Sequence, residues 1–304
     1  MNDMNHIFCK LIRKGELDVI HIEHPLFHAA LLLQGAQLVE FSPKKNNFKN
    51  LLWLSKSIEY KQGQSLRGGI PICWPWFGNL EKNPEKIKQQ VKSTHTPAHG
   101  IVRNIPWNIH SIKESCEKVI VELEVKSNES TLNIWPYDFS LMARFTFSHT
   151  LNLELVTTNT GKENFSFSQA LHTYLPTSDI SRTYIHNTHK ANYIDALDGW
   201  KEKIQQGRIK FDQETDRLYF FKNKSGSEQF ELRVEAPEHQ LTLTTKNSRS
   251  AVIWNPWVKK SQRLNQFSAE DYKSMFCIES ANVMSNHNTA LIGEKNSIYL
   301  SIKL

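Results

Sequence analysis

The sequence predicts an all-β protein built from antiparallel strands. The main observation is a period-2 alternation of apolar and polar residues, which is typical of strands buried on one face. Between Phe139 and Leu155 most odd positions are apolar, whereas positions such as Arg144 and Glu154 are polar. In addition, no amphipathic segment is long enough to supply the helical crossovers of a parallel sheet. Antiparallel strands are therefore the simplest interpretation.

Further strands are predicted on both sides of this segment. The same alternation is present in Val119 to Val125, Phe230 to Val234, Leu241 to Leu243 and Ile298 to Leu304. One short helix is expected after Phe267, because Ser268 can cap its first turn and Asp271 stands three residues further on. The 304 residues contain no convincing linker or internal repeat, so we expect one domain over residues 1–304.

Composition and charge indicate a globular protein and exclude several function classes. The 37 Lys and Arg residues against 31 Asp and Glu give a net charge of +6 but form no basic block, so no nucleic acid partner is expected. No apolar run has the length of a membrane helix or a signal peptide, so no membrane association is expected. The four cysteines, Cys9, Cys73, Cys116 and Cys277, lack metal-type spacing and suit reduced thiols in the cytoplasm.

The stretch from Ser65 to Asn104 is distinctive because glycines, prolines and aromatic residues surround two arginines. Arg67 begins the segment RGGIPICWPWFG, and Arg103 ends the segment AHGIVR. Glycines and prolines shape irregular loops, where binding sites are commonly built. Each arginine offers a planar fork suited to an oxyanion, although a surface ion pair is the more usual role of arginine. From the residues alone, both interpretations stay open.

Two residues in apolar strands are candidates for proton transfer. Glu279 follows the apolar run Met275 to Ile278. Burial there would raise its pKa toward the range of a general base, whereas simple alternation would point it at solvent. His172 lies in a strand-like apolar segment, where a histidine is more often a hydrogen-bonded core residue than a catalyst. Both alternatives stay open for each residue.

Other positions carry weaker signals. His95 and His99 have the spacing of two metal ligands on one helix face, but Pro97 between them argues against a helix. Asp216 could be only a charge at a strand edge. Trp254 begins a turn-rich aromatic segment, WNPW, that could line a sugar pocket or simply pack. The chain contains no glycine-rich phosphate loop, nucleophile elbow or cysteine-based zinc pattern.

Six segments, taken in order, resemble the glucose-6-phosphate 1-epimerases, also called hexose-6-phosphate mutarotases, of the aldose 1-epimerase superfamily. These segments are Leu66 to Gly78, His99 to Asn104, Ala170 to Tyr174, Asp216 to Tyr219, Val252 to Trp257 and Phe276 to Glu279. Together they span about two thirds of the chain. Each one alone is a weak signal, but six in the right order are specific.

The resemblance implies a single large antiparallel β-sandwich of the galactose-mutarotase type, with an open cleft and no required cofactor. In such enzymes a glutamate and a histidine interconvert the α and β anomers of a sugar through its open-chain aldehyde. By position, Glu279 matches the base that deprotonates the anomeric hydroxyl. His172 matches the acid that protonates the ring oxygen as the ring opens.

The resemblance also implies a phosphorylated sugar substrate. Arg67 and Arg103 match the phosphate-side arginines of the family. His99 and Asp216 match residues that bind substrate hydroxyls. We therefore expect a hexose 6-phosphate as substrate, with D-glucose 6-phosphate first, and a cytoplasmic monomer.

Two other classes of function compete with this expectation. A non-catalytic carbohydrate-binding β-sandwich would keep the fold and an aromatic surface, such as Trp74 and Trp76, on which a sugar could stack. Such a protein would not need both proton-transfer positions. Metal-dependent hydrolysis through His95, His99 and Glu279 would require bound zinc. The sequence does not rank the individual hexose 6-phosphates.

Overall fold

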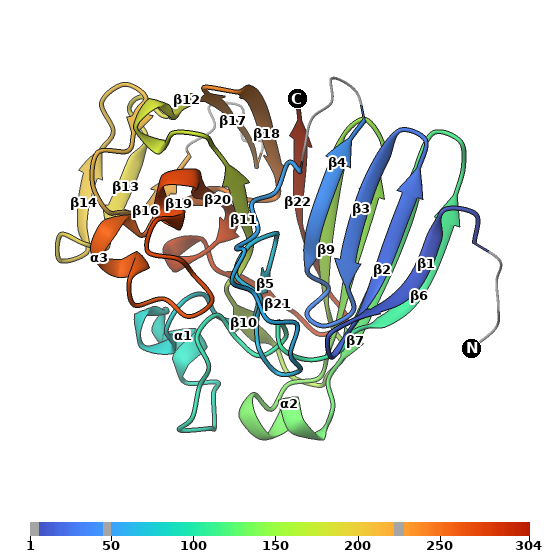
Figure 1. Cartoon of the computed structure of the whole chain (residues 1–304). Coiled ribbons are helices and arrows are strands. Elements are labelled where there is room, and N and C mark those ends of the chain that lie inside the picture. Colours follow the sequence, from blue (N-terminus) through green and yellow to red (C-terminus); the bar gives the residue numbers. More distant parts are fainter. Residues whose placement is uncertain (1–5, 45–49, 222–227) are drawn as a thin grey trace.

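The computed structural model describes residues 6–44, 50–221 and 228–304. Strands dominate this part of the chain, and its α-helices are short: α1 (Glu85–Lys88), α2 (Glu129–Ile134) and α3 (Trp257–Ser261). The paired strands in these residues all run antiparallel to their neighbours. Figure 1 shows them packed as two layers. The prediction of an all-β, antiparallel sandwich is confirmed.

One layer is a nine-stranded sheet. In spatial order its strands are β15 (Ile209–Lys210), β12 (Tyr184–His186), β17 (Gln229–Ala236), β18 (His239–Lys246), β22 (Lys295–Lys303), β9 (Leu151–Asn159), β8 (Phe139–Phe147), β7 (Val119–Lys126) and β6 (Asn108–Glu114). The predicted alternation is present in β8 and β9, where every second side chain is buried. The buried set, which includes Phe145 and Leu153, belongs to the main core.

The other layer contains a four-stranded and a seven-stranded sheet. The four-stranded sheet has the order β1 (Cys9–Lys14), β2 (Leu17–His24), β3 (Phe27–Leu32) and β4 (Leu38–Pro43). The seven-stranded sheet has the order β14 (Lys201–Ile204), β13 (Asn192–Asp195), β16 (Thr215–Phe220), β19 (Ser250–Asn255), β20 (Met275–Asn282), β11 (Gln169–Pro176) and β5 (Ile72–Cys73). In Figure 1 the blue strands β1 to β4 face the green strands of the nine-stranded sheet. Phe27 and Phe41 contact Phe147 across this interface.

Short elements connect the sheets. A small sheet pairs β10 (Phe165–Phe167) with β21 (Asn288–Ala290). The 3-10 helices are η2 (Leu80–Lys82), η3 (Ile180–Arg182), η4 (Asp271–Ser274) and η5 (Met284–Asn286). The helix expected after Phe267 is therefore a 3-10 turn that begins at Asp271. Its carboxylate accepts a hydrogen bond from the Ser268 backbone N–H at 2.7 Å.

Three adjacent strands of the seven-stranded sheet, β19, β20 and β11, are buried on both faces. Phe276 and Ile278 of β20 belong to the main core between the layers. Cys277 and Glu279 alternate with them and lie on the other face, which loops cover. Glu279 is only 1% exposed, which decides between the two interpretations of this residue.

Trp74 and Trp76 do not provide a surface for sugar stacking, so that expectation is wrong. Both indoles are fully buried. Trp74 packs edge-on against Trp135 with ring centroids 4.9 Å apart. Gly100 allows the chain to lie close to the backbone of Trp74, because its φ is +81° and a Cβ would lie 1.9 Å from the Trp74 carbonyl oxygen. Burial of two indoles in the core removes more apolar area from water than an open cleft would.

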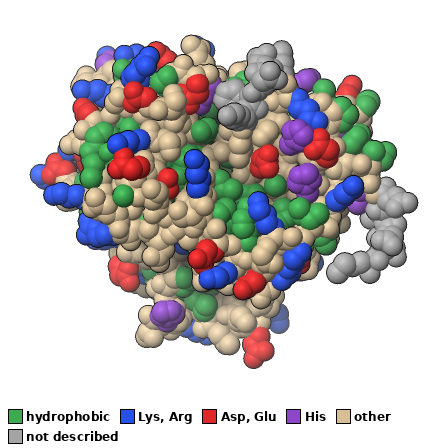
Figure 2. All heavy atoms as spheres, in the orientation of Figure 1, with side chains coloured by type: hydrophobic (Ala, Val, Ile, Leu, Met, Phe, Trp, Pro, Cys, Tyr) green, Lys and Arg blue, Asp and Glu red, His purple; other side chains and the backbone are tan. Residues whose placement is uncertain are grey.

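The surface of this part of the chain carries mixed charge. Figure 2 shows Lys and Arg side chains interspersed with Asp and Glu over the face drawn. No helix of the described residues is long and apolar enough to cross a membrane. The expectation of one domain over residues 1–304 stays a prediction, and residues 1–5, 45–49 and 222–227 lie outside the described part.

Candidate active site

The register of the seven-stranded sheet brings His172 and Glu279 together. His172 of β11 lies directly opposite Glu279 of β20. On the other side of Glu279, Val252 of β19 and then Leu218 of β16 continue the row. Because directly opposed residues of antiparallel strands point to the same face, the histidine and the glutamate share the covered face of the sheet.

A second row, two residues along each strand, adds a carboxylate and two aromatic side chains. Tyr174 of β11 lies opposite Cys277 of β20, and Trp254 of β19 lies opposite Asp216 of β16. Side chains of both rows form the floor of a pocket of about 500 Å³. Loops and short helices add its walls, which include Arg67, Phe77, His99, Trp200, Lys260 and Leu264.

His172 and Glu279 contact each other at the floor of this pocket. Nε2 of His172 lies 3.4 Å from Oε1 of Glu279, and both side chains are buried. Within the described residues, Nδ1 of His172 and Oε2 of Glu279 have no hydrogen-bond partner. Buried polar atoms are normally hydrogen-bonded, so two such atoms beside a pocket indicate a position for the polar groups of a ligand.

Burial determines the protonation of this pair. Burial raises the pKa of Glu279 well above its usual value, and the Asp216 carboxylate adds to the rise. Burial, assisted by the guanidinium groups of Arg103 and Arg67, lowers the pKa of His172 to about 3. Burial therefore favours the neutral imidazole and the protonated carboxyl, so that the pair shares one acidic proton.

His99 lies beside His172, with ring centroids 5.4 Å apart. Its Nδ1 accepts a hydrogen bond from the Gly78 backbone N–H at 3.3 Å and lies 3.3 Å from Sγ of Cys73. Burial and the positive charge of Arg103 lower the pKa of His99, so its ring is neutral. Because Nδ1 accepts, the ring proton is on Nε2, which can donate to a sugar oxygen.

The two arginines lie in the pocket and in a hollow next to it. Arg67 lines the pocket itself. Arg103 lines a neighbouring hollow of about 590 Å³, which shares Arg67 and Tyr174 with the first pocket. Both side chains are partly buried, and neither guanidinium forms an ion pair with a carboxylate of the described residues. Removing a cation from water without an anionic partner is unfavourable, so this arrangement suits an anionic ligand.

Asp216 adds a second carboxylate to the pocket. Burial raises its pKa. The ammonium group of Lys260, at 3.6 Å from Oδ2, opposes this rise. Asp216 is therefore a hydrogen-bond acceptor whose ionisation depends on a neighbouring cation.

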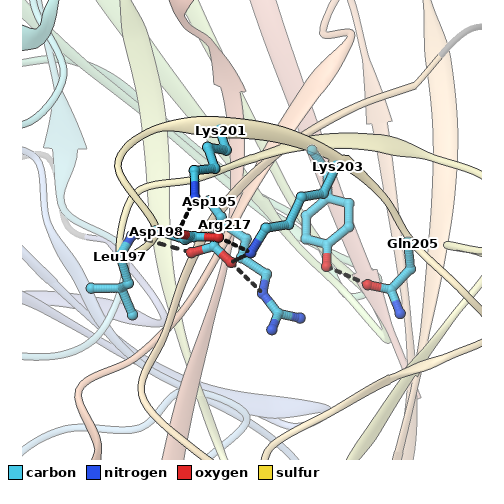
Figure 3. A network of polar contacts seen from close by, with 8 residues as sticks. Asp195, Leu197, Asp198, Lys201, Lys203, Gln205 and Arg217 are labelled. Atoms are coloured by element: carbon cyan, nitrogen blue, oxygen red, sulfur yellow. Dashed lines mark hydrogen bonds and ion pairs between the residues drawn. The ribbon is translucent and has the colours of Figure 1, made fainter.

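An ion-pair network holds the turn between β13 and β14, which forms another wall of the pocket (Figure 3). Asp195 accepts hydrogen bonds from the Leu197 backbone N–H at 3.1 Å and from Nζ of Lys203 at 2.8 Å. Arg217 lies 3.9 Å from the same carboxylate. These contacts hold the turn that presents Leu197 and Trp200 to the pocket.

The structure gathers most of the predicted site residues around one pocket. Those that line it are Arg67, His99, His172, Asp216 and Glu279, while Arg103 lines the adjoining hollow. Sequence reasoning missed Tyr174, although a position two residues after His172 on a strand shares its face. It also missed Trp200 and Lys260, because no periodicity determines where a turn or an isolated helix lies relative to a sheet.

The metal-dependent alternative gains no support from the arrangement of side chains. His95 lines neither the pocket nor the adjoining hollow. The described residues contain no group of three or more His, Cys, Asp or Glu side chains that could hold a metal ion.

The antiparallel β-sandwich is the fold of the sugar mutarotases. The family model for aldose 1-epimerase matches residues 18–303. The chain therefore belongs to the aldose 1-epimerase family, and it is an isomerase that interconverts the anomers of an aldose.

Relatives and solved structures agree with this assignment. The chain is 31% identical over 267 residues to the Escherichia coli protein named "Putative glucose-6-phosphate 1-epimerase", covering 88% of this chain and 83% of the relative. It is 31% identical over 268 residues to a protein of the same name from Cenchrus ciliaris, covering 84% of this chain and 75% of the relative. A crystal structure of a "putative mutarotase" from Salmonella typhimurium superposes with a TM-score of 0.86 at 27% identity, covering 99% of this chain and 94% of the other.

Proposed function

We propose that this protein interconverts the α and β anomers of a hexose 6-phosphate, with D-glucose 6-phosphate as the first substrate to test. The supporting observation is that Arg67 and Arg103, both partly buried, have no carboxylate partner in the described chain. Each charge-assisted hydrogen bond to a phosphate would contribute roughly 1.5 to 3 kcal/mol. The relatives from Escherichia coli and Cenchrus ciliaris, whose names specify glucose 6-phosphate, support the same substrate.

In the proposed mechanism Glu279 removes the proton of the anomeric hydroxyl while His172 protonates the ring oxygen. The ring opens to the aldehyde, rotation exposes its other face, and closure reverses both proton transfers. The two groups lie on neighbouring strands with Nε2 and Oε1 3.4 Å apart, so both can reach one anomeric centre. Each positioned acid or base typically contributes about two to four powers of ten in rate.

The pair already contains the single proton that this cycle requires. Burial disfavours both charged forms and therefore favours this proton on Glu279. Arg67 and Arg103 also disfavour the imidazolium form of His172. A phosphate bound to these arginines would offset their positive charge. We therefore expect substrate binding to shift the proton toward His172 and to leave Glu279 as the carboxylate base.

His99 and Asp216 complete the proposed site as ligands of the sugar hydroxyls. The Nε2–H of His99 would donate, and the carboxylate of Asp216 would accept. The cysteines Cys9, Cys73, Cys116 and Cys277 are all free thiols, which suits the predicted cytoplasmic location. The monomeric state also stays a prediction, and light scattering on the purified protein tests it.

Exchange NMR or polarimetry on D-glucose 6-phosphate tests the proposal. The purified protein should accelerate anomer exchange of the phosphorylated sugar much more than that of free D-glucose. Equal acceleration of anomer exchange for both sugars would overturn the assignment of a phosphate site. No acceleration for glucose 6-phosphate would overturn the proposal that this sugar is the substrate. His172→Asn should bind the sugar phosphate but lose turnover, whereas a catalytic role for His172 is excluded if this variant keeps full activity.

A further inference from the structure

Lys260 reaches the pocket from outside the sheet. It lies on α3 and lines the pocket opposite the sheet floor residue Asp216. Its Nζ is 3.6 Å from Oδ2 of Asp216, 3.5 Å from Oε1 of Glu214, and 5.8 Å from the ring centroid of Trp254. A single flexible cation thus lies close to two carboxylates, one of which lines the pocket, and to the ring of Trp254 in the same pocket.

The WNPW segment fixes the position of this lysine. Asn255 is fully buried, and its side-chain oxygen accepts a hydrogen bond from the Trp257 backbone N–H at 2.9 Å. The side-chain nitrogen of Asn255 donates to the carbonyls of Tyr272 at 2.9 Å and Met275 at 2.8 Å. The start of α3 is therefore tied to the chain that enters β20, the strand of Glu279.

The other end of α3 is tied to the same part of the chain. Ser261 is fully buried, and its hydroxyl donates to the carbonyls of Val258 at 2.9 Å and Ala269 at 3.1 Å. Hydrogen bonds at both ends hold a helix of five residues that is too short to be stable alone. From the sequence alone, the WNPW segment could either line a sugar pocket or simply pack. In the structure it does both: Trp254 lines the pocket, and Asn255 anchors the helix that presents Lys260.

We propose that Lys260 is a positioning residue for the reaction, which holds the carboxylate of Asp216 ionised and directed at the sugar, and that the WNPW segment serves to place it there. This inference rests on the proposed function, because it assigns Asp216 the role of accepting a sugar hydroxyl. Lys260 itself need not touch the substrate.

The charges around Asp216 show why a cation is needed. Glu214 beside it on the chain and Asp195 on the neighbouring strand β13 both raise the pKa of Asp216, in addition to burial. Lys260 is the cation that opposes them. Asp216 in turn raises the pKa of Glu279. Lys260 therefore acts directly on Asp216, and only through the charge of Asp216 on Glu279.

The groups facing the catalytic pair complete the electrostatic balance. His172 on β11 contacts Glu279 directly, and Arg67 and Arg103 act mainly on His172. None of these groups is among those that shift the pKa of Asp216. A shift of the acid-side midpoint in a Lys260 variant can therefore be assigned to Asp216 and its neighbours.

The test compares the pH profiles of kcat/KM for anomer exchange of glucose 6-phosphate in four variants. Lys260→Met should move the acid-side midpoint upward by about half a pH unit, a modest shift because the pair is partly exposed. Activity should then fall roughly threefold below the midpoint and approach that of the parent protein at higher pH. Lys260→Arg should restore the original midpoint. Glu214→Gln should move the midpoint downward, because it removes a negative charge beside Asp216.

Lys259→Met is the matched control, because Lys259 is an exposed residue of the same helix. It should leave the midpoint unchanged. A Lys260→Met profile that equals the parent profile multiplied by one constant factor at every pH would indicate a purely structural role and overturn the inference. Failure of Lys260→Arg to restore the midpoint would also overturn it.

A measurement without substrate separates this inference from the proposed function. The ¹³C NMR titration of the Asp216 carboxyl, assigned with Asp216→Asn, should show a higher pKa in Lys260→Met than in the parent protein. If the parent protein does not act on glucose 6-phosphate but this shift occurs, the proposed substrate fails and the electrostatic role of Lys260 stands. If the parent protein is active and the shift is absent, the inference fails alone.

Discussion

The outer face of the nine-stranded sheet and the covered face of the seven-stranded sheet place carboxylates in opposite environments. Glu122 on β7 faces outward and pairs with Arg144, whose Nε lies 2.7 Å from its Oε1. Glu279 on β20 faces a pocket and has only His172 as a polar contact at 3.4 Å among the described residues. Both residues follow the same alternation along a strand.

The pKa values of the two carboxyl groups shift in opposite directions, because one face is open to solvent and loops cover the other. The Ser111 hydroxyl and the Arg144 guanidinium stabilise the ionised form of Glu122 and lower its pKa. Burial destabilises the ionised form of Glu279 and raises its pKa. A strand carboxylate thus becomes a structural ion-pair member or a candidate base according to the loops above it.

Replacing each glutamate by glutamine is the strongest test of this comparison. Glu279→Gln should lower kcat for anomer exchange by about two to four powers of ten, because the base is lost. Its free energy of unfolding above neutral pH should not fall, since a carboxyl with a raised pKa destabilises the fold when it ionises. Glu122→Gln should leave kcat unchanged. Equal kcat values for the two variants, measured by exchange NMR, would contradict the assignment.

The arginines allow a second comparison. Arg144 is neutralised by Glu122 and by Glu154, whereas Arg67 has no carboxylate ion pair in the described chain. Arg67→Met should lower kcat/KM for glucose 6-phosphate roughly 10- to 100-fold, the loss of one charge-assisted contact. Its activity on free glucose should change little. Arg144→Met is the control and should change kcat/KM for neither sugar. An equal loss of kcat/KM for glucose 6-phosphate and for free glucose in Arg67→Met would contradict a contact with the phosphate.

The alkaline side of the pH profile of kcat/KM tests whether Glu279 and His172 share one proton, because kcat/KM reports the pKa values of the free enzyme. The lowered pKa of His172, at about 3, and the raised pKa of Glu279 bound a wide range in which the pair keeps that proton. We expect kcat/KM to fall on the alkaline side, where the pair loses it. A kcat/KM that shows no alkaline fall would indicate an ordinary carboxylate.

The smallest expected effect concerns stability at the outer face. The folded-state pKa of Glu122 is lowered, so its interactions stabilise the fold above its unfolded pKa and are lost as pH falls through the folded value. Glu122→Gln should therefore lower the free energy of unfolding by about 0.5 to 1 kcal/mol at pH 7. The difference should shrink below about pH 4. Urea unfolding at both pH values measures it, and a pH-independent difference would rule out this ion pair as its cause.

Much of the fold was predictable from local pattern. In β8 and β9 the alternation alone assigns each residue to a face, because the side-chain direction repeats every two residues whatever the strand pairs with. The candidate site was predictable in part, because His172 and Glu279 stand in segments that resemble a known family. Trp74 shows the limit: its aromatic setting suggests a sugar surface, but tertiary packing buries it against Trp135.

The sequence by itself determined the long alternating strands such as β8 and β9, their inward and outward faces, the resemblance to a family and the residues that could transfer protons. Only the tertiary structure decided that Glu279 is buried, that Arg103 lies in an adjoining hollow, and that Lys260 reaches Asp216. The physical reason is that a strand's period specifies a face, whereas the material covering that face comes from loops and helices distant in sequence. That covering sets the burial and the charge around each carboxylate, and therefore its chemistry.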